Sequence, residues 1–376
     1  MLLDLISLKT KVIEELRGLL SEESIAKATK DPHSKRKPRP CGITIHTGIG
    51  CSYRCSYCYI YDMGFPAKPT PYPLTPIEIV YSLAINPYVV PKVTLAAFGS
   101  VTEPLLSETK GRFIEYLTEI YSYLKLPSQV STKGILDDGT INALKKGDPN
   151  LSILLTIVTL RMHKYIEKFA PNPMDRLEGA AKALRSGFKV AVFIRPIIPG
   201  VTDREYKEML ETFESYGIKD LVIGSFRATY TNVAKMKSAG IDVSEIESRL
   251  KRRPGKKEQI TIFSSDIKSK LKEEALKKGF NVFESACAAN IVAHNECCIM
   301  CNRGPCGSLN KLTKVPSEEV IEFFNTRGIR VIKLDVDDGR LSLWLDRKSK
   351  IDRAELDKAK LIASYVTRRN VVIHYQ

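Results

Sequence analysis

The sequence lacks the long apolar runs of a membrane protein, and its first residues are not expected to be the leader of a secreted one. No apolar run reaches the roughly 18 residues that a helix needs to cross a bilayer. Asp4 and other charged residues interrupt the N-terminal stretch, where a signal peptide would need a continuous apolar core. We therefore expect a cytoplasmic protein whose residues 1–30 are helical and amphipathic.

Cysteine is missing from most of the chain and is concentrated in two places. No cysteine lies between Cys58 and Cys287. Disulfide scaffolds distribute their cysteines more evenly, so two tight groups in a long chain indicate metal binding. The first group is Cys51, Cys55 and Cys58, and the second is Cys287, Cys297, Cys298, Cys301 and Cys306. The remaining cysteine, Cys41, is expected to be a buried strand residue.

Acidic residues are too few to balance the basic ones. The 43 Asp and Glu residues face 58 Lys and Arg residues, which leaves a net charge of +15. This balance favours anionic partners, above all nucleic acid, although a lysine-rich soluble surface would produce the same charge. Basic residues gather in 31–40, which we expect to be an extended, proline-rich linker, and in 251–257. Aromatic residues do not alternate with these charges, so stacking on single-stranded bases is not indicated.

Internal repeats and low-complexity tracts are also absent, and strand and helix patterns alternate instead. The expected strands are Ile43–His46, Val93–Phe98, Gln129–Thr132, Ser152–Val158, Lys189–Arg195 and Leu221–Ser225. The expected helices between them are Pro76–Ala84, Gly111–Leu124, Asp137–Lys146, Met174–Arg185 and Asp203–Tyr216. This alternation predicts an α/β fold with a parallel sheet. Six units are too few for a closed eight-stranded barrel, so we predict a partial (β/α)6 barrel that is open on one side.

The chain is expected to divide into four parts. These are an N-terminal helix and basic linker (1–40), the partial barrel (41–286), a Cys-rich metal-binding segment (287–310) and a small C-terminal α/β domain (311–376). Inside the barrel range we expect a basic connection at 233–257 and a further βαβ-like unit at 260–284. The C-terminal domain is expected to contain helices at 318–326 and 353–367 and strands at 331–334, 341–345 and 371–375.

The first cysteine group has the spacing C-x3-C-x2-C and directly follows the first expected strand. A 4Fe–4S cube normally takes four thiolates, so three thiolates on one loop leave one iron open to an exogenous ligand. One alternative is a zinc ribbon, which needs a second C-x2-C pair that this region lacks. The other is an electron-transfer cluster with four thiolate ligands.

The stretch CSYRCSYCY resembles the signature of the radical S-adenosylmethionine (SAM) superfamily, and the resemblance extends over about residues 41–265. The resemblance implies a 4Fe–4S cluster on Cys51, Cys55 and Cys58 that cleaves SAM reductively to a 5′-deoxyadenosyl radical. The radical then removes a hydrogen atom from a substrate. An electron donor such as ferredoxin or flavodoxin is also implied. The resemblance also implies that the expected partial barrel is of the radical SAM type.

The same resemblance implies which residues contact SAM. Gly99, Ser100 and Glu103 fall in a segment similar to the family's Gly-Glu-Pro-Leu variant, in which Glu103 and the backbone near Gly99 would hold the SAM amino group. Ser131 and Thr132 match hydroxyls that face the ribose or carboxylate, and Arg195 would pair with the carboxylate. Taken singly, each residue also has a structural explanation, such as a turn, a helix cap or an ion pair.

Residues 170–203 are similar to the spore-photoproduct-lyase-like branch of the superfamily. Those lyases carry a cysteine as hydrogen-atom donor at a position where this chain has Ser100. A serine hydroxyl is a much poorer hydrogen-atom donor than a thiol. The resemblance therefore extends to the branch and does not imply photoproduct repair.

The second cysteine group is expected to hold an auxiliary 4Fe–4S cluster, and structural zinc is the alternative. Five unmetallated thiols on a polar loop would be a third possibility. The ligands we select are Cys287, Cys298, Cys301 and Cys306. The spacing barely distinguishes Cys298 from Cys297, and His294 is a possible substitute ligand.

The leading hypothesis is thus a radical SAM enzyme acting on a macromolecule, with nucleic acid and especially tRNA as the favoured substrate. A peptide or protein side chain is the alternative, suggested by the auxiliary cluster. Two other classes are weighed: an iron–sulfur electron-transfer or sensing protein without SAM chemistry, and a zinc-stabilised nucleic-acid-binding module.

Overall fold

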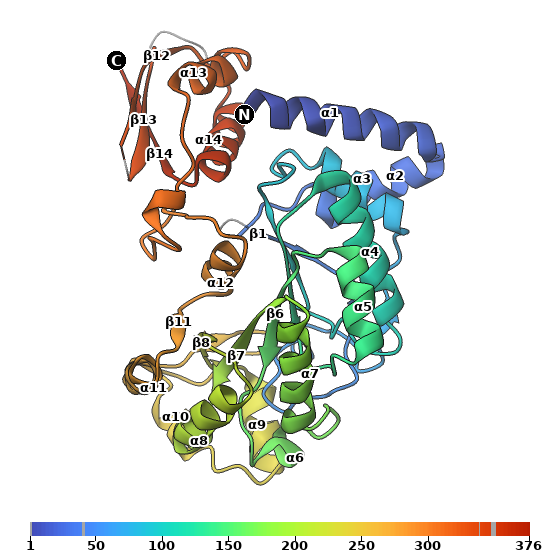
Figure 1. Ribbon diagram of the computed structural model, residues 1–376, viewed down its shortest axis with the longest axis vertical. Coiled ribbons are helices and arrows are strands. Elements are labelled where there is room, and N and C mark those ends of the chain that lie inside the picture. Colours follow the sequence, from blue (N-terminus) through green and yellow to red (C-terminus); the bar gives the residue numbers. More distant parts are fainter. Residues whose placement is uncertain (1, 40–41, 338, 347–350) are drawn as a thin grey trace.

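The computed structural model describes residues 2–39, 42–337, 339–346 and 351–376, so Cys41 and the expected boundary at residues 40–41 lie outside the described residues. Its centre is a sheet of seven parallel strands in the order β1-β4-β5-β6-β7-β8-β11 (Figure 1). The strands are β1 (Gly42–Ile45), β4 (Leu95–Phe98), β5 (Ser128–Thr132), β6 (Ser152–Thr156), β7 (Lys189–Ile197), β8 (Asp220–Ser225) and β11 (Asn281–Phe283). All six strands expected from the sequence belong to this sheet, and the α/β partial-barrel prediction is confirmed.

Helices cover the outer face of the sheet, and Figure 1 shows α3, α4, α5 and α7 side by side along it. The outer helices are α3 (Pro76–Ile85), α4 (Lys110–Leu124), α5 (Asp138–Gly147), α7 (Pro173–Arg185), α8 (Thr202–Ser215) and α11 (Ser265–Lys277). Local signals start them: Thr75 and Glu78 form a capping box on α3, and the Asp137 side chain caps α5. The main apolar core lies between these helices and the sheet.

A helix that the sequence analysis missed, α12 (Ala286–Ala293), packs on the inner face of the sheet (Figure 1). Ala289 lies in one apolar cluster with Leu154, Ala191 and Val222 of the strands. The Asn290 amide donates to the carbonyl of Pro127 at 3.4 Å, and the Asn290 Oδ1 lies 3.0 Å from the Ser152 hydroxyl. Pro127 and Ser152 stand where strands begin, so α12 lies toward the amino-terminal edge of the sheet.

The N-terminal segment contains α1 (Leu2–Leu19) and α2 (Glu22–Lys30), followed by a 3-10 turn at Pro32–Ser34. The expected extended linker is therefore wrong for its first half, where His33 and Ser34 are buried. The Asn86 amide donates to the carbonyls of His33 and Arg36, and the Arg36 guanidinium lies 2.8 Å from a ring nitrogen of His46. These contacts hold the linker on the barrel because charge repulsion is outweighed by buried hydrogen bonds.

Short elements outside the main sheet lie in the connections that follow its strands. They are the hairpin β2 (Gly48–Ile49) and β3 (Thr70–Pro71), the helices α6 (His163–Ile166), α9 (Tyr230–Ser238) and α10 (Ser244–Ser248), and the pair β9 (Arg227–Ala228) and β10 (Ile260–Thr261). The expected connection at 233–257 thus contains helices. The expected βαβ unit at 260–284 is wrong in part, because β10 pairs antiparallel with β9 outside the main sheet and only β11 joins it.

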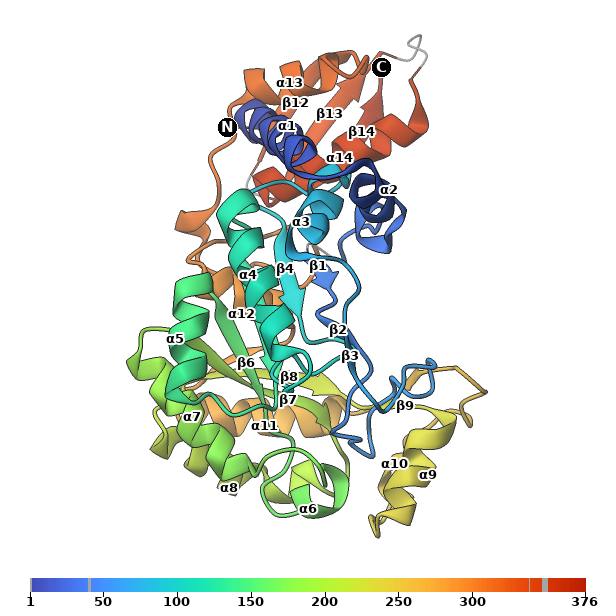
Figure 2. The same cartoon turned by 90° about the vertical axis from the view of Figure 1, so that its right-hand side faces the viewer.

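The C-terminal part combines α13 (Ser317–Asn325), β12 (Val331–Val336), β13 (Arg340–Leu345), α14 (Arg353–Thr367) and β14 (Asn370–Tyr375), after a 3-10 turn at Leu309–Lys311. These elements match the expected ones and enclose a separate apolar cluster. Leu2 of α1 and Val90 of the barrel also belong to it. Figure 2 shows α1 beside α13. Within the described residues, the structure holds no helix long and apolar enough to cross a membrane.

Candidate active site

The first cysteine group lies on a loop that follows β2 at the carboxyl-terminal edge of the sheet. Gly50 opens the loop with a φ of +87°, and a Cβ on Gly50 would lie 2.3 Å from the carbonyl oxygen of Pro66. Only glycine fits this position. The Cys51 amide donates to the same carbonyl at 3.1 Å, which fixes the start of the loop. Cys55 is buried, whereas Cys51 and Cys58 are half-buried.

Burial raises the pKa of all three thiols of the first group, which favours their neutral form unless a cation or metal faces them. Three soft sulfur donors on one loop suit iron or zinc better than a hard cation. No three His, Cys, Asp or Glu side chains in the described part of the chain converge as ligands of a single metal ion do. The ligands of a 4Fe–4S cube bind different irons and need not converge on one point.

A buried ion pair connects the loop of the first cysteine group to the sheet. Glu167 and Arg176 lie 2.8 Å apart with no exposed side-chain surface, and the Tyr57 hydroxyl donates to the Glu167 carboxylate. Arg176 also donates to the carbonyl of Thr156, the last residue of β6, at 3.1 Å. Since Tyr57 stands between two of the cysteines, this network anchors the cysteine loop to the sheet.

A second support comes from the start of α9. The Asn232 side chain donates to the Tyr57 carbonyl at 3.0 Å, and its oxygen accepts from the Thr229 amide at 2.8 Å. Asp62, at the far end of the cysteine loop, accepts hydrogen bonds from the hydroxyls of Thr229 and Thr231. The N-terminal cap of α9 therefore also clamps the cysteine loop.

Lys133 is a functional candidate that the sequence analysis missed. It follows β5 directly, and its ammonium lies 5.5 Å from the centre of the Tyr57 ring. Burial alone would lower the pKa of Lys133, but Cys55, Glu167 and Cys58 raise it above its usual value. Lys133 thus supplies a positive charge beside the thiols. Its place directly after a strand, next to Ser131 and Thr132, was the available signal.

The structure brings together four of the residues predicted to contact SAM. Gly99 has a φ of +90°, and a Cβ on it would lie 2.1 Å from the Ser131 carbonyl oxygen. Glu103 is buried and accepts from the Leu105 amide at 3.1 Å, from the Lys133 amide at 2.8 Å and from the Thr132 hydroxyl. The Thr132 hydroxyl oxygen in turn accepts from the Gly134 amide. Glu103 and Thr132 therefore brace the ends of β4 and β5 against each other.

These bonds leave different residues free to face a ligand. Both carboxylate oxygens of Glu103 are engaged by the protein, whereas Ser131 is half-buried and Ser100 is exposed. The charge of Glu103 also contributes to raising the pKa of Cys51, after the larger effect of burial. The braced strand ends thus lie next to the cysteine loop.

Arg195 lies apart from these four residues, near the end of β7. Its side chain crosses β8 at Gly224, where a Cβ would lie 2.7 Å from the Arg195 Cδ. Burial lowers the pKa of Arg195, and the positive charges of Arg227 and Arg303 add to this effect. Tyr59, next to Cys58, opposes it. Arg195 forms no ion pair with any residue that the structure describes.

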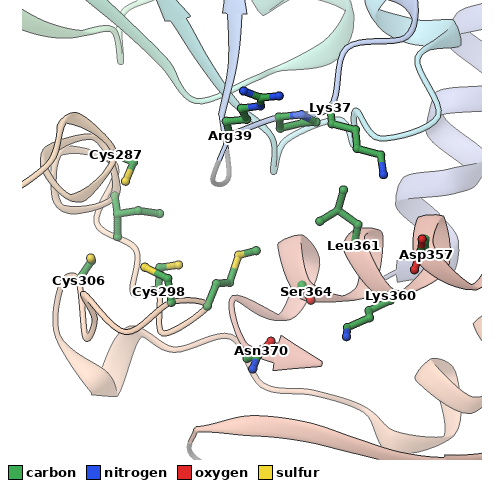
Figure 3. Close-up of a pocket in the computed structure, with 14 residues that line it drawn as sticks. Lys37, Arg39, Cys287, Cys298, Cys306, Asp357, Lys360, Leu361, Ser364 and Asn370 are labelled. Carbon is green, nitrogen blue, oxygen red and sulfur yellow. The ribbon is translucent and has the colours of Figure 1, made fainter. Parts of the chain in front are cut away.

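The second cysteine group lines a cavity of about 550 Å³ (Figure 3). Cys287 comes from α12, and Cys298, Cys301 and Cys306 come from the loop that follows it. Cys298 and Cys306 exchange two backbone hydrogen bonds of 2.9 Å. Burial raises the pKa of Cys306 to about 12, and the four other cysteines of the group contribute.

The residues that were alternatives for this second group lie elsewhere. Cys297 is fully buried and is not among the residues lining the cavity. His294 does not line it either, and a ring nitrogen of His294 lies 2.9 Å from the Asn290 carbonyl. The four cysteines selected from the sequence are thus the four that face one space.

A profile of the radical SAM superfamily matches residues 45–213. Residues 45–213 form a radical SAM domain. The matched range contains the first cysteine group, Glu103, Ser131, Thr132, Lys133 and Arg195. Domains of this superfamily are enzyme domains that bind an iron–sulfur cluster and SAM, and the match indicates that the chain carries such a domain.

Solved structures and one curated protein are similar to the chain. A spore photoproduct lyase mutant with bound SAM and dinucleoside spore photoproduct matches with a TM-score of 0.56 and 15% identity, over 68% of this chain and 81% of its own. Another mutant of that lyase matches with a TM-score of 0.55 and 17% identity, over 67% and 79%. These likenesses show the fold. Uncharacterized protein ORF301 of Acidianus two-tailed virus is 27% identical over 188 residues, 45% of this chain, and the chain spans 61% of that protein's length.

Proposed function

We propose that the cysteine loop Cys51–Cys58 holds a 4Fe–4S cluster at three of its irons and that SAM binds at the fourth. When bound and reduced, such a cluster supplies an electron that splits SAM into methionine and a 5′-deoxyadenosyl radical, which removes a hydrogen atom from the substrate. The observation that carries the proposal is the placement of three thiols on one loop at the carboxyl-terminal edge of a radical SAM domain.

The surrounding residues take separate roles in this proposal. Lys133 offsets the negative charge of the thiolates. Glu103 and Thr132 hold the ends of β4 and β5 so that the Gly99 backbone and the Ser131 hydroxyl can face SAM. Arg195 has no acidic partner among the described residues, so its guanidinium is available to the SAM carboxylate. The proposed role of Glu103 thus becomes indirect, because its oxygens are engaged.

We further propose that the substrate is a nucleic acid. Arg195, Arg227, Lys268 and Arg303 come from four different segments. The charges of Arg227 and Arg303 add to the effect of burial, which lowers the pKa of Arg195, and the charges of Arg303 and Arg195 act in the same way on Lys268. Such a group of cations around β7 and β8 suits a phosphate backbone. The linker at 31–40, folded against the barrel, becomes a weaker candidate for this role.

A peptide or protein side chain remains the alternative substrate, which the second cysteine group favours. Photoproduct repair is not proposed, because Ser100 lacks the thiol that would return a hydrogen atom. We also propose iron–sulfur rather than zinc at the second group, since the described cysteines do not converge on a single-ion site.

The decisive experiment is anaerobic reconstitution of the protein with iron, sulfide, SAM and dithionite. We expect 5′-deoxyadenosine to form, and we expect the variant Cys51→Ala/Cys55→Ala/Cys58→Ala to form none. Cys297→Ala is the matched control, because this cysteine faces neither the loop nor the cavity. A protein that binds iron without SAM-dependent change in the electron paramagnetic resonance spectrum would instead be an electron-transfer protein. Zinc without iron would indicate a zinc-stabilised module.

A further inference from the structure

The cavity beside the second cysteine group joins three parts of the chain that are far apart in sequence. One wall is α12 with the loop that carries Cys298, Cys301 and Cys306. The next is the linker at Lys37–Arg39, and the third is α14 with Asn370 at the start of β14. Figure 3 shows Cys287, Cys298 and Cys306 at one end of the cavity and the labelled residues of the linker and α14 around the rest.

The loop that carries Cys298, Cys301 and Cys306, here called the second cysteine loop, is itself part of the apolar contact between the barrel and α14. Cys298 lies in one buried cluster with Leu95 at the start of β4, Ile291 of α12 and Tyr365 of α14. Cys287, Cys306 and Met300 pack against the same cluster. If this loop lost its structure, apolar surface of Leu95, Ile291 and Tyr365 would therefore be exposed to solvent.

Polar contacts run through the same junction. The Ile299 amide donates to the carbonyl of Arg368, just after α14, at 2.8 Å. The Arg368 guanidinium donates to the Val93 carbonyl at 2.8 Å and pairs with Glu296. The Tyr365 hydroxyl lies 3.4 Å from the carbonyl of Pro38 in the linker. Residues on both sides of the second cysteine loop thus hold α14 against the barrel.

The loop has little regular structure of its own to keep this shape. Between α12 and the turn at Leu309–Lys311, the backbone is ordered by the Cys298–Cys306 pair, by a hydrogen bond from the Gly304 amide to the Cys301 carbonyl, by the bond from Ile299 to Arg368 and by close glycine contacts. A Cβ on Gly307 would lie 2.2 Å from the Glu296 carbonyl oxygen, and one on Gly304 would lie 2.9 Å from that of Cys298. A metal centre bound by cysteines of such a loop would couple its order to metal binding.

The position also separates this group from the first one. Leu95, Pro127 and Ser152, which contact the second group or α12, stand where their strands begin. The first group lies at the opposite, carboxyl-terminal edge. With four cysteines facing one cavity, a cube would be fully ligated by protein and would offer no open iron, the arrangement typical of a structural site.

We propose that the second cluster is a structural fastener: Cys287, Cys298, Cys301 and Cys306 bind a 4Fe–4S cluster that locks the C-terminal part and the linker onto the barrel. This proposal rests on the cluster proposed above and assigns its role. The fastener also shapes the loop between Cys301 and Cys306, which contains Arg303 of the proposed substrate surface. It thereby links the cluster to the proposed substrate surface without placing it in the chemistry.

The test compares the wild-type protein with Cys287→Ala/Cys298→Ala/Cys301→Ala/Cys306→Ala, and Cys297→Ala serves as the control. We expect the fourfold variant to lose about half of its iron, since a cube holds about four irons per site. Hydrogen exchange should accelerate in α14 and in residues 35–39, and trypsin should cut faster after Lys35 and Arg36. The control should match wild type in all three measurements.

Unchanged iron in the fourfold variant would overturn the cluster assignment, and so would zinc in place of half of the iron. Lower iron with unchanged exchange in α14 would overturn the fastening role. Formation of 5′-deoxyadenosine without substrate should persist in the fourfold variant, because that reaction belongs to the first group. If the wild-type protein formed no 5′-deoxyadenosine, the proposed function would be wrong. The fastening role would then still be decided by the iron content and the hydrogen exchange.

Should the fourfold variant be insoluble, Cys51→Ala/Cys55→Ala/Cys58→Ala provides the same comparison. This variant carries only the second group, so oxidation and chelation remove only that iron. We expect the treatment to accelerate exchange in α14, and no acceleration would overturn the proposal.

Discussion

At the scale of single residues, the candidate site depends on positions where backbone geometry leaves no choice. Gly99 holds a positive φ where β4 ends, and its Cα hydrogen faces the Ser131 carbonyl of the neighbouring strand. Glu103 accepts from the Lys133 amide and the Thr132 hydroxyl across the same gap, and from the Leu105 amide on its own side. The residues predicted to contact SAM therefore also stabilise the fold. A control variant of similar backbone geometry separates the effect of a substitution on stability from its effect on SAM binding.

Gly99→Ala should destabilise the protein more than Gly64→Ala. Both glycines have a positive φ near +90°, which costs a residue with a side chain about 1–2 kcal/mol. Only Gly99 adds a clash, because a Cβ on Gly64 meets nothing within 4 Å. Overpacking adds roughly 1–3 kcal/mol to the cost at Gly99. Denaturant unfolding measures both values, and equal losses of unfolding free energy would contradict the close approach to Ser131.

The buried histidines of the linker junction should make stability depend on pH. Burial lowers the pKa of His46 to about 3 from an ordinary 6.5, and burial likewise lowers that of His33, whose ring centre lies 5.2 Å from that of His46. The unfolded chain then binds more protons, so stability is full above pH 6.5 and falls as the pH drops below it. Each pH unit costs about 1.4 kcal/mol per such histidine.

Replacing His46 by Gln should flatten this acid dependence, and His163→Gln should leave it intact. The measurement is the free energy of unfolding between pH 7 and about pH 5, the range in which the unfolded histidine takes up its proton. An identical slope in wild type and His46→Gln would show that His46 is not a neutral buried group.

At the scale of elements, a loop without regular structure is held by its neighbours. The cysteine loop is tied to β6 and α7 through Glu167 and Arg176, and to α9 through Asn232 and Asp62. The sequence analysis treated 233–257 as a connection because its charges hid the helical pattern. The capping box of Thr229 and Asn232 was the signal that could have revealed α9.

Asn232→Ala should loosen the cysteine loop. The substitution removes the Asn232 half of the capping box and leaves the buried Tyr57 carbonyl without its donor, which costs about 1–3 kcal/mol. Faster hydrogen exchange in residues 51–64 and faster loss of iron under chelation should follow. Ser238→Ala, at an exposed position of the same helix, is the control and should change neither rate. Equal exchange in both variants would contradict the clamp.

At the scale of the whole molecule, the basic residues fall into groups with different roles. Arg36 of the linker packs on the barrel, whereas Arg227 and Arg303 lie close enough to Arg195 for their charges to affect its pKa. The proposed nucleic-acid surface thus depends on segments that the chain brings together only on folding.

Binding of RNA should weaken steeply as salt increases, because phosphate contacts release counterions. Arg227→Gln and Arg303→Gln should each weaken binding and reduce the slope of log K against log salt by about 1. Lys11→Gln, an exposed change on α1, is the control of equal charge. Fluorescence anisotropy with a labelled tRNA at several salt concentrations measures the slopes. A slope near zero, or equal losses with Lys11→Gln, would count against nucleic acid.

The sequence by itself determined the strands of the sheet, and it predicts the chemistry of the first cysteine loop. Alternating apolar strands and amphipathic helices such as Ser152–Val158 and Met174–Arg185 carry their periodicity locally, and C-x3-C-x2-C is a local spacing. Only the tertiary structure decided which groups meet. Three features depend on contacts between segments far apart in the chain: the charge of Lys133 near Cys55, the absence of Cys297 from the cavity lining, and the charge of Arg303 near Arg195. No local pattern encodes such contacts, because burial and electrostatic neighbourhood are properties of the packed molecule.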